Sequence, residues 1–234
     1  MTDQRIPPVP APPRRRHAAG TIVALLFIVA GIVSALVINH RRQFSSQFVQ
    51  DPNAPAEAPD PRTEADLPVL GTVDPFSLTE RSGKTITLED LKGRVWIAES
   101  FFTYCGSLCP KMFRNLSQLH REFTGKDEPK IVSITADPLR DTLEAITEYA
   151  RTYQADTERW WFLRGEEEQL RDLTMSLLLT YKIGDPTAHN GNFMLVDRDG
   201  RIRGKYVGTI LGGGTEMDKL RRDLRLLLAA PKKP

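Results

Sequence analysis

A run of 21 residues without a charged side chain, residues 18–38, constrains this chain more than any other feature of its sequence. The run is mostly Ala, Val, Leu and Ile, and at 1.5 Å per residue a helix of this length crosses a hydrocarbon core of about 30 Å. A cleaved signal peptide is the alternative, but its apolar region is only about 7 to 15 residues long and ends at a small-residue cleavage site. The sequence therefore predicts one uncleaved transmembrane helix at 18–38.

The arginines around this run predict its orientation. Arg5 and residues 14–16 precede the run, whereas only Arg41 and Arg42 follow it. By the positive-inside rule, the Pro- and Arg-rich tail at 1–17 stays in the cytoplasm and the rest of the chain faces outward. Five prolines make this tail a poor match to an amphipathic transit peptide. We therefore expect a single-pass protein of a bacterial cytoplasmic membrane, with its domain on the periplasmic or outer side.

A polar segment separates the predicted helix from the remainder of the chain. Residues 51–68 contain five prolines and five acids, and so bury too little apolar surface to offset the entropy of chain ordering. We predict a flexible tether over residues 39–69, followed by a domain at 70–234. The net charge of residues 69–234 is about +1, which gives no electrostatic support for a nucleic-acid partner.

Strand-like runs alternate with helix-like patterns after residue 70. The apolar runs at 95–102 and 130–135 suit buried strands, and each precedes a helical pattern. The second of these helices is predicted to open at Asp141, because Glu144 three residues on resembles a capping box. The later elements are a strand at 161–163, a helix at 170–177, a hairpin of 193–196 with 202–207, and a helix from about 215. This order predicts an α/β, three-layer fold with a mixed sheet, compatible with a thioredoxin-like arrangement.

The two cysteines, Cys105 and Cys109, lie directly between the first predicted core strand and the helix after it, where α/β folds place chemistry. Pro110 suits the first helical position, so Cys109 is expected at the helix amino end, where the dipole and N–H groups stabilise a thiolate. A structural disulfide closing five residues would stabilise by only about 2 kcal/mol, against nearly 5 kcal/mol for a loop of about 100. The spacing therefore favours a functional pair, for redox work or for metal binding.

The histidines decide which metal such a pair could hold. Two thiolates with one imidazole suit Cu(I), whereas structural zinc normally needs a fourth protein ligand. His17 and His40 flank the membrane run, and His120 is expected on a helix surface about three turns after the cysteines. His189 lies in a polar loop before the strand at 193–196, where it could be a ligand or a solvated loop residue. The residues alone leave these two interpretations of His189 open.

Several segments, taken in order, resemble the Sco/SenC copper-chaperone family, and the resemblance covers most of residues 71–229. The matching segments are Asp74-Pro75-Phe76-Ser77-Leu78 ahead of Gly83, Phe102-Thr103-Tyr104-Cys105 to Cys109-Pro110, Asp137-Pro138 with Arg140-Asp141-Thr142, Trp161-Phe162-Leu163 with Gly165, and His189 before Phe193-Met194-Leu195-Val196-Asp197 and Gly200.

This resemblance implies a thioredoxin-like fold that binds copper through Cys105, Cys109 and His189 and serves assembly of the copper site of cytochrome c oxidase. The cargo would be Cu(I), with Cu(II) left open. The expected partners are the copper-site subunit of that oxidase, other copper chaperones and thioredoxin-like reductants.

A metal-free thiol-disulfide oxidoreductase is the alternative function, with Cys105 and Cys109 as its redox-active pair keeping client cysteines reduced. His189 discriminates between the two, because dithiol exchange does not require an imidazole. A thiol peroxidase is disfavoured: by resemblance to peroxiredoxins it should carry Thr or Ser three residues before the reactive cysteine, and Phe102 and Gly106 occupy those places.

Overall fold

The computed structural model describes residues 60–123, 127–179, 191–210 and 215–232, together with three isolated helical residues, Gly31, Ser34 and Ala35. The chain divides into two compact units, Met1–Ala58 and Pro59–Pro234. The predicted cytoplasmic tail at 1–17, nearly all of the predicted transmembrane helix at 18–38 and most of the predicted tether at 39–69 lie outside the described residues. No helix within the described part of the chain is both long enough and apolar enough to cross a membrane.

An eight-stranded mixed sheet forms the centre of the second unit, in the order β1-β8-β7-β4-β5-β6-β2-β3. Its middle strands β4, β5 and β6 are parallel, and all other neighbours are antiparallel. The strands are β1 Gly71–Thr72, β2 Ser77–Glu80, β3 Thr85–Thr87, β4 Trp96–Phe101, β5 Lys130–Thr135, β6 Trp160–Arg164, β7 Asn192–Val196 and β8 Arg201–Val207.

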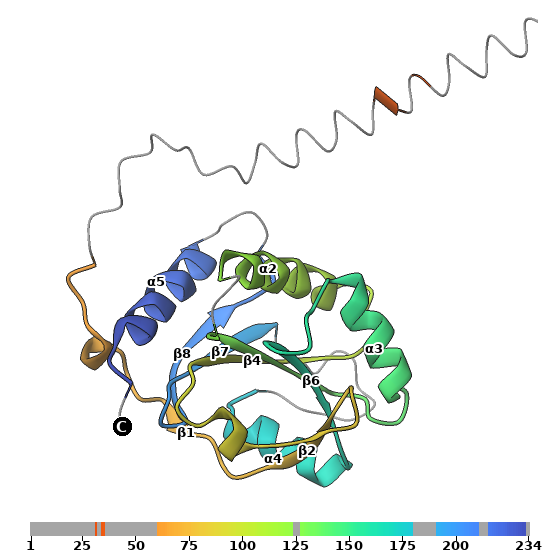
Figure 1. Ribbon diagram of the computed structural model, residues 1–234, viewed down its shortest axis with the longest axis horizontal. Coiled ribbons are helices and arrows are strands. Elements are labelled where there is room, and N and C mark those ends of the chain that lie inside the picture. The colour runs from red at the N-terminus through yellow and green to blue at the C-terminus, as the bar shows by residue number, and fades with distance from the viewer. Residues whose placement is uncertain are drawn as a thin grey trace, which may run out of the picture. The chain divides into compact units, whose positions relative to one another are not determined.

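Helices cover both faces of this sheet, as Figure 1 shows. The helices are α2 Leu108–Glu122, α3 Leu143–Thr152, α4 Glu167–Ser176 and α5 Thr215–Ala229, with 3-10 helices η1 Glu64–Asp66 and η2 Leu88–Leu91. Side chains of α2, α3 and α5 share one hydrophobic core with Ile97 and Phe101 of β4, and those of α4 share a second core with Trp96 and Ala98. The predicted α/β, three-layer fold with a mixed sheet is confirmed.

The complete burial of the two central strands, β4 and β5, explains why apolar runs in the sequence predicted them correctly. Every residue of β4 and of β5 is buried, because helices cover the sheet on both sides and successive side chains point to opposite faces. The hairpin of β7 and β8 was also predicted, and Gly200 at its turn has a φ of +77°. β1, β2 and β3 were not predicted, because their segments are short and polar, with little more than Leu78 and Ile86 pointing inward.

The predicted start of α3 at Asp141 is wrong by one residue. The N-cap is Thr142, whose hydroxyl accepts a hydrogen bond from the backbone N–H of Ala145 at 3.2 Å. Asp141 is fully buried and binds elsewhere. The pattern misled because Asp and Thr are both good N-caps, and only tertiary contacts decide between adjacent candidates.

His120 was predicted on a helix surface, and this is also wrong. Its side chain is 8% exposed, and its Nε2 atom lies 2.9 Å from Oδ2 of Asp156. Burial and the neighbouring Arg159 guanidinium lower the pKa of His120. The cause is its position four residues after Leu116, which places it on the same buried side of α2.

Residues before the predicted domain boundary at residue 70 also pack against the second unit. Leu67 is buried, and its carbonyl oxygen accepts a hydrogen bond of 2.8 Å from the buried guanidinium of Arg203. Arg62 forms an ion pair of 2.9 Å with Asp223 on α5. These contacts hold residues 60–69 against β8 and α5, although the composition of residues 51–68 is typical of a flexible segment.

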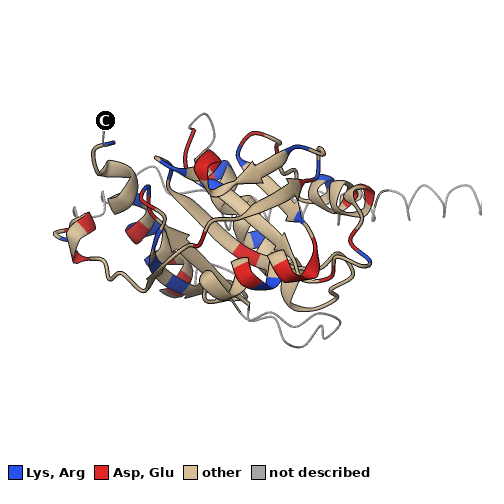
Figure 2. Ribbon diagram, turned by 90° about the horizontal axis from the view of Figure 1, so that it is seen from below, with Lys and Arg blue, Asp and Glu red and all other residues tan. Residues whose placement is uncertain are grey.

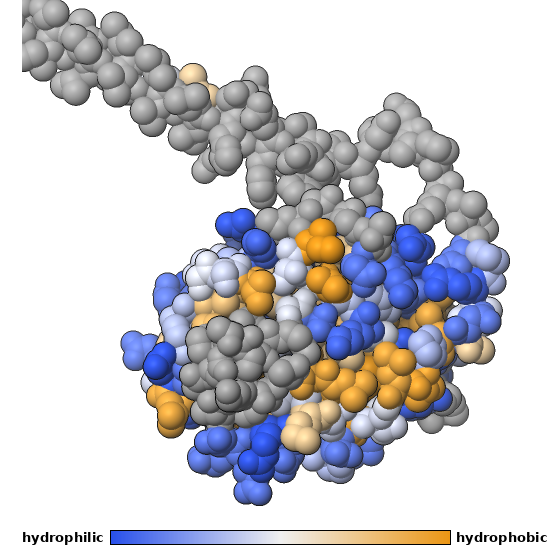
Figure 3. Space-filling model, turned by 180° about the vertical axis from the view of Figure 1, so that it is seen from behind, coloured by the Kyte–Doolittle hydropathy of each residue, from blue (hydrophilic) through white to orange (hydrophobic). Residues whose placement is uncertain are grey.

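Basic and acidic residues are interspersed along the ribbon in Figure 2, in keeping with the small net charge of this unit. Figure 3 shows the molecule from the side opposite to that of Figure 1. On this face, apolar side chains form separate patches among hydrophilic ones. The most exposed large apolar side chain among the described residues is Leu139, at 83%.

Candidate copper and dithiol site

The structure places both cysteines at the C-terminal end of β4. β4 ends at Phe101, Cys105 lies in the following loop, and Cys109 is the second residue of α2. The backbone N–H of Cys109 donates a hydrogen bond of 3.3 Å to Sγ of Cys105. Both side chains are buried thiols, 6% and 0% exposed. The strand-to-helix junction therefore brings the two sulfur atoms together beneath the surface, as the sequence predicted.

The predicted stabilisation of a Cys109 thiolate by the helix amino end is not what the structure shows. A hydrogen bond with the Cys105 side chain, together with burial, raises the pKa of Cys109, although the nearby backbone of Phe102 opposes part of this rise. α2 begins at Leu108, so Pro110 is its third residue rather than its first. The hydrogen bond with Cys105 and burial thus hold the Cys109 thiol protonated, despite its place near the amino end of α2.

A carboxylate whose role the sequence did not indicate lies below the thiols. Glu99 is fully buried in β4, and burial raises its pKa to about 8. The Ser133 hydroxyl on β5 opposes part of this rise, but neither Glu99 oxygen has a hydrogen-bond partner of good geometry. The charge of Glu99 in turn contributes to the raised pKa of Cys109. The sequence signal that could have indicated this residue is the presence of an acid in the middle of the apolar run at 95–102.

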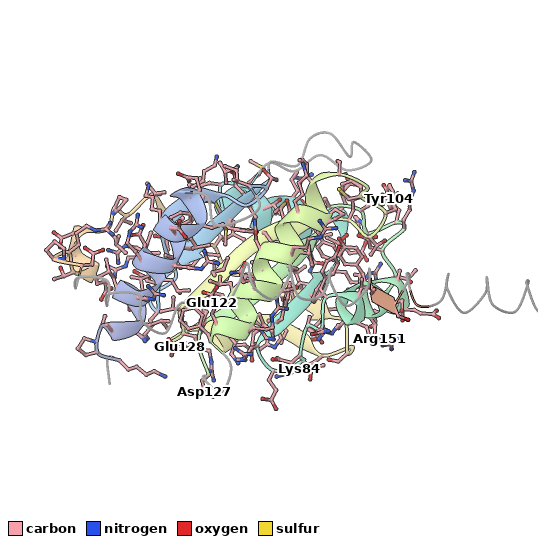
Figure 4. All side chains as sticks on the ribbon, turned by 90° about the horizontal axis from the view of Figure 1, so that it is seen from above. Lys84, Tyr104, Glu122, Asp127, Glu128 and Arg151 are labelled. Atoms are coloured by element: carbon pink, nitrogen blue, oxygen red, sulfur yellow. The ribbon has the colours of Figure 1, made fainter. Side chains whose placement is uncertain are left out.

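Acidic residues of the turn between β5 and α3 hold the loop just before Cys105. Asp141 accepts hydrogen bonds from the backbone N–H of Thr103 at 3.1 Å and from its hydroxyl at 2.6 Å. The Tyr104 hydroxyl donates to the carboxylate of Asp137. Figure 4 shows Tyr104 near the N-terminal end of α2, with Glu122 and Glu128 near the other end. Asp137 and Asp141 therefore hold the loop before Cys105 in place, a role that their sequence positions did not reveal.

The third predicted ligand, His189, lies outside the described residues. Among the residues that are described, no three His, Cys, Asp or Glu side chains are arranged to hold a metal ion. The chain returns at Gly191, just before β7, and β7 runs antiparallel to β4 with Ala98 opposite Met194. The first residues of β7 therefore lie near the C-terminal end of β4.

Comparison with known proteins decides the family. The sequence model of the SCO1/SenC family matches residues 67–223, well over half of the chain. This protein belongs to the SCO1/SenC family. The SCO1 protein homolog of Bacillus subtilis is 30% identical over 147 residues, which cover 60% of this chain and 76% of that protein. A Stutzerimonas stutzeri protein named as copper-binding is 31% identical over 146 residues, covering 59% of this chain and 70% of that protein.

A solved Sco structure supports the same assignment. BsSco, described as a member of the Sco family of cytochrome c oxidase assembly proteins with a disulfide switch, matches with a TM-score of 0.63 and 26% identity. The match covers 73% of this chain and all of that chain. The SCO1/SenC domain of this protein therefore has the thioredoxin-like Sco fold, with its cysteine pair at the junction of β4 and α2.

Proposed function

We propose that this SCO1/SenC protein is a membrane-tethered copper chaperone that assists assembly of the copper site of cytochrome c oxidase. Its cargo is Cu(I), held by Cys105, Cys109 and His189, and its client is the copper-site subunit of the oxidase. The observation that carries the proposal is the pair of buried thiols side by side at the β4–α2 junction. Two thiolates in a site shielded from water are soft donors suited to Cu(I).

The contacts of Gly191 support His189 as the third ligand. The carbonyl oxygen of Gly191 accepts a hydrogen bond of 2.7 Å from the N–H of Gly208. A Cβ atom at Gly191 would lie 3.7 Å from Sδ of Met112, one turn after Cys109 in α2. It would also lie 2.3 Å from the Thr209 side chain, so a larger residue at this position would require Thr209 to move. The chain thus lies against α2 two residues after His189.

Copper loading of this pair should depend on its redox state. Thiolates are the ligands, and the sulfur atoms of a Cys105–Cys109 disulfide have lost that donor capacity. We expect the reduced full chain in mild detergent to bind one Cu(I), and the oxidised chain to retain less than about a tenth of that copper. Titration of both forms against a Cu(I) chelator measures this. Equal uptake by the two forms would exclude the cysteine pair as the site.

The contact between the two thiols also favours a second candidate function. The Cys109 N–H reaches Cys105 Sγ, so disulfide formation needs little rearrangement of the loop. A metal-free oxidoreductase would use this pair to keep client cysteines reduced, by passing two electrons and two protons to a client disulfide. The role of His189 separates this function from copper delivery.

Membrane attachment through residues 18–38 is part of the proposal and has its own test. The arginine excess before this run predicts an amino terminus in the cytoplasm of a bacterial cell and a domain outside the cytoplasmic membrane. A protease added to spheroplasts should digest the domain and leave the amino tail protected. Recovery of a shortened protein free of the membrane would show instead that the run is a cleaved signal.

A further inference from the structure

We propose that Asp141 is a positioning residue for the cysteine pair, acting through Thr103 to place Cys105 opposite Cys109. The inference deepens the proposed function, since it concerns the same pair. It follows from the three hydrogen bonds that the buried carboxylate of Asp141 accepts. Two come from Thr103, which is two residues before Cys105, and the third comes from the hydroxyl of Thr135 at 2.5 Å.

The two bonds from Thr103 join chain segments that are 38 residues apart in sequence. Thr135 ends β5, where its parallel partner in β4 is Phe101, so Asp141 bridges the ends of two adjacent strands. From Phe102 the backbone turns, because the N–H of Cys105 donates to the Phe102 carbonyl at 3.2 Å. Asp141 therefore fixes the middle of this turn, and the position of Cys105 follows from it.

The sequence suggested that Asp141 caps α3, but another residue performs that role. Thr142 caps α3, so the helix does not need the Asp141 carboxylate. Burial raises the pKa of Asp141 despite the hydrogen bonds from Thr103 and Thr135. Desolvation of a buried carboxylate costs free energy, which hydrogen bonds from hydroxyl and amide donors offset only in part. We infer that the residue serves the geometry of the cysteine loop.

The same turn holds the loop at a second point. The Tyr104 hydroxyl donates to Asp137, and the guanidinium of Arg140 stacks on the Tyr104 ring with its carbon 4.6 Å from the ring centre. Both residues before Cys105 are thus held by the β5–α3 turn. Asp141 is the deeper contact, because it is fully shielded from solvent and binds the backbone as well as a side chain.

The test measures how favourably the two thiols form a disulfide, without copper. In a glutathione buffer the dithiol gives two electrons and two protons to glutathione disulfide, which becomes two glutathione molecules, and the Cys105–Cys109 bond forms. Asp141→Ala in the full chain should lower this equilibrium constant about tenfold, which makes the reduction potential about 30 mV more positive. Thr103→Val removes only the hydroxyl bond and should shift the constant in the same direction by a smaller amount. The double variant should shift no further than Asp141→Ala, because that change already removes both bonds from Thr103.

Two control variants separate positioning from general stability. Asp141→Asn keeps an oxygen for Thr103 and an amide for Thr135, so it should stay within about twofold of the parent constant. Thr174→Val removes a buried hydroxyl that donates to Leu170 in α4, on the opposite face of the sheet. It should lower stability and leave the constant unchanged.

An unchanged constant in Asp141→Ala and Thr103→Val, or additive shifts in the double variant, would overturn the positioning role. Cu(I) affinity is measured on the same variants and should fall about tenfold for Asp141→Ala. A parent protein that binds no copper would contradict the proposed function, while the glutathione equilibrium would still decide the role of Asp141.

Discussion

Replacing His189 with alanine should weaken Cu(I) binding by about two orders of magnitude while leaving the dithiol of Cys105 and Cys109 able to exchange with glutathione. Imidazole completes a Cu(I) site with two thiolates, and its loss corresponds to roughly 3 kcal/mol of binding free energy. Electron transfer between thiols and disulfides needs no imidazole. Cu(I) affinity by chelator competition and reduction potential are measured on the same preparations.

Two sets of variants give this experiment its controls. Cys105→Ser and Cys109→Ser should each remove both activities, because each destroys the dithiol and leaves a harder oxygen that suits Cu(I) poorly. His120→Gln changes a histidine that is bonded to Asp156 toward the other end of α2, and should leave Cu(I) affinity unchanged. If His189→Ala binds Cu(I) as tightly as the parent protein, His189 is not a ligand, and the metal-free oxidoreductase becomes the better function.

The order of strands and helices along the chain and the position of the cysteines were predictable, because each depends on the local sequence pattern. The apolar runs that became β4 and β5 are buried on both faces, so every position carries the signal. Cys105 and Cys109 follow β4 directly, and chain order alone places them at the strand end. The family resemblance also rested on local pattern, namely short segments in a fixed order along the chain, and it is confirmed by the match to residues 67–223.

The support of the site was not predictable, because it depends on contacts between distant segments. Asp141 had the sequence signature of a helix cap and instead binds Thr103. Glu99 interrupts an apolar run, but its position below the thiols requires the pairing of β4 with β5 and the packing of α2. The direction of the Cys109 pKa shift was also missed. Helix position suggests stabilisation of a thiolate, and only the packed structure reveals the Cys105 hydrogen bond and the burial that oppose it.

Replacing Glu99 with glutamine should change how stability depends on pH. Between about pH 5 and pH 8, the free energy of unfolding of Glu99→Gln, relative to that of the parent protein, should rise by about 1.4 kcal/mol per pH unit. An unfolded glutamate has a pKa of 4.5, whereas burial raises that of folded Glu99 to about 8. In this window the folded parent holds a proton that the unfolded chain releases. Rising pH therefore favours unfolding of the parent, and glutamine cannot titrate.

The contribution of Glu99 to stability is fully present below about pH 4.5 and is lost as the pH rises to about 8, where the folded protein also ionises. The total difference is on the order of 5 kcal/mol, because the side chain is fully buried and water does not screen it. Urea unfolding of the reduced full chain at several pH values, followed by tryptophan fluorescence, measures it. All three tryptophans lie in the Pro59–Pro234 unit, and Trp160 donates a hydrogen bond of 2.9 Å to Ser133 beside Glu99.

Glu168→Gln is the matched control for this measurement, since Glu168 is an exposed carboxylate of α4 on the other face of the sheet. Its stability should follow that of the parent protein at every pH, because the Glu168 side chain is exposed and the substitution removes no buried contact. A difference between Glu99→Gln and the parent that stays constant from pH 5 to pH 8 would mean that Glu99 is ionised in the folded protein. The buried charge beneath the thiols would then require a cationic partner, and none of the described residues supplies one with good geometry.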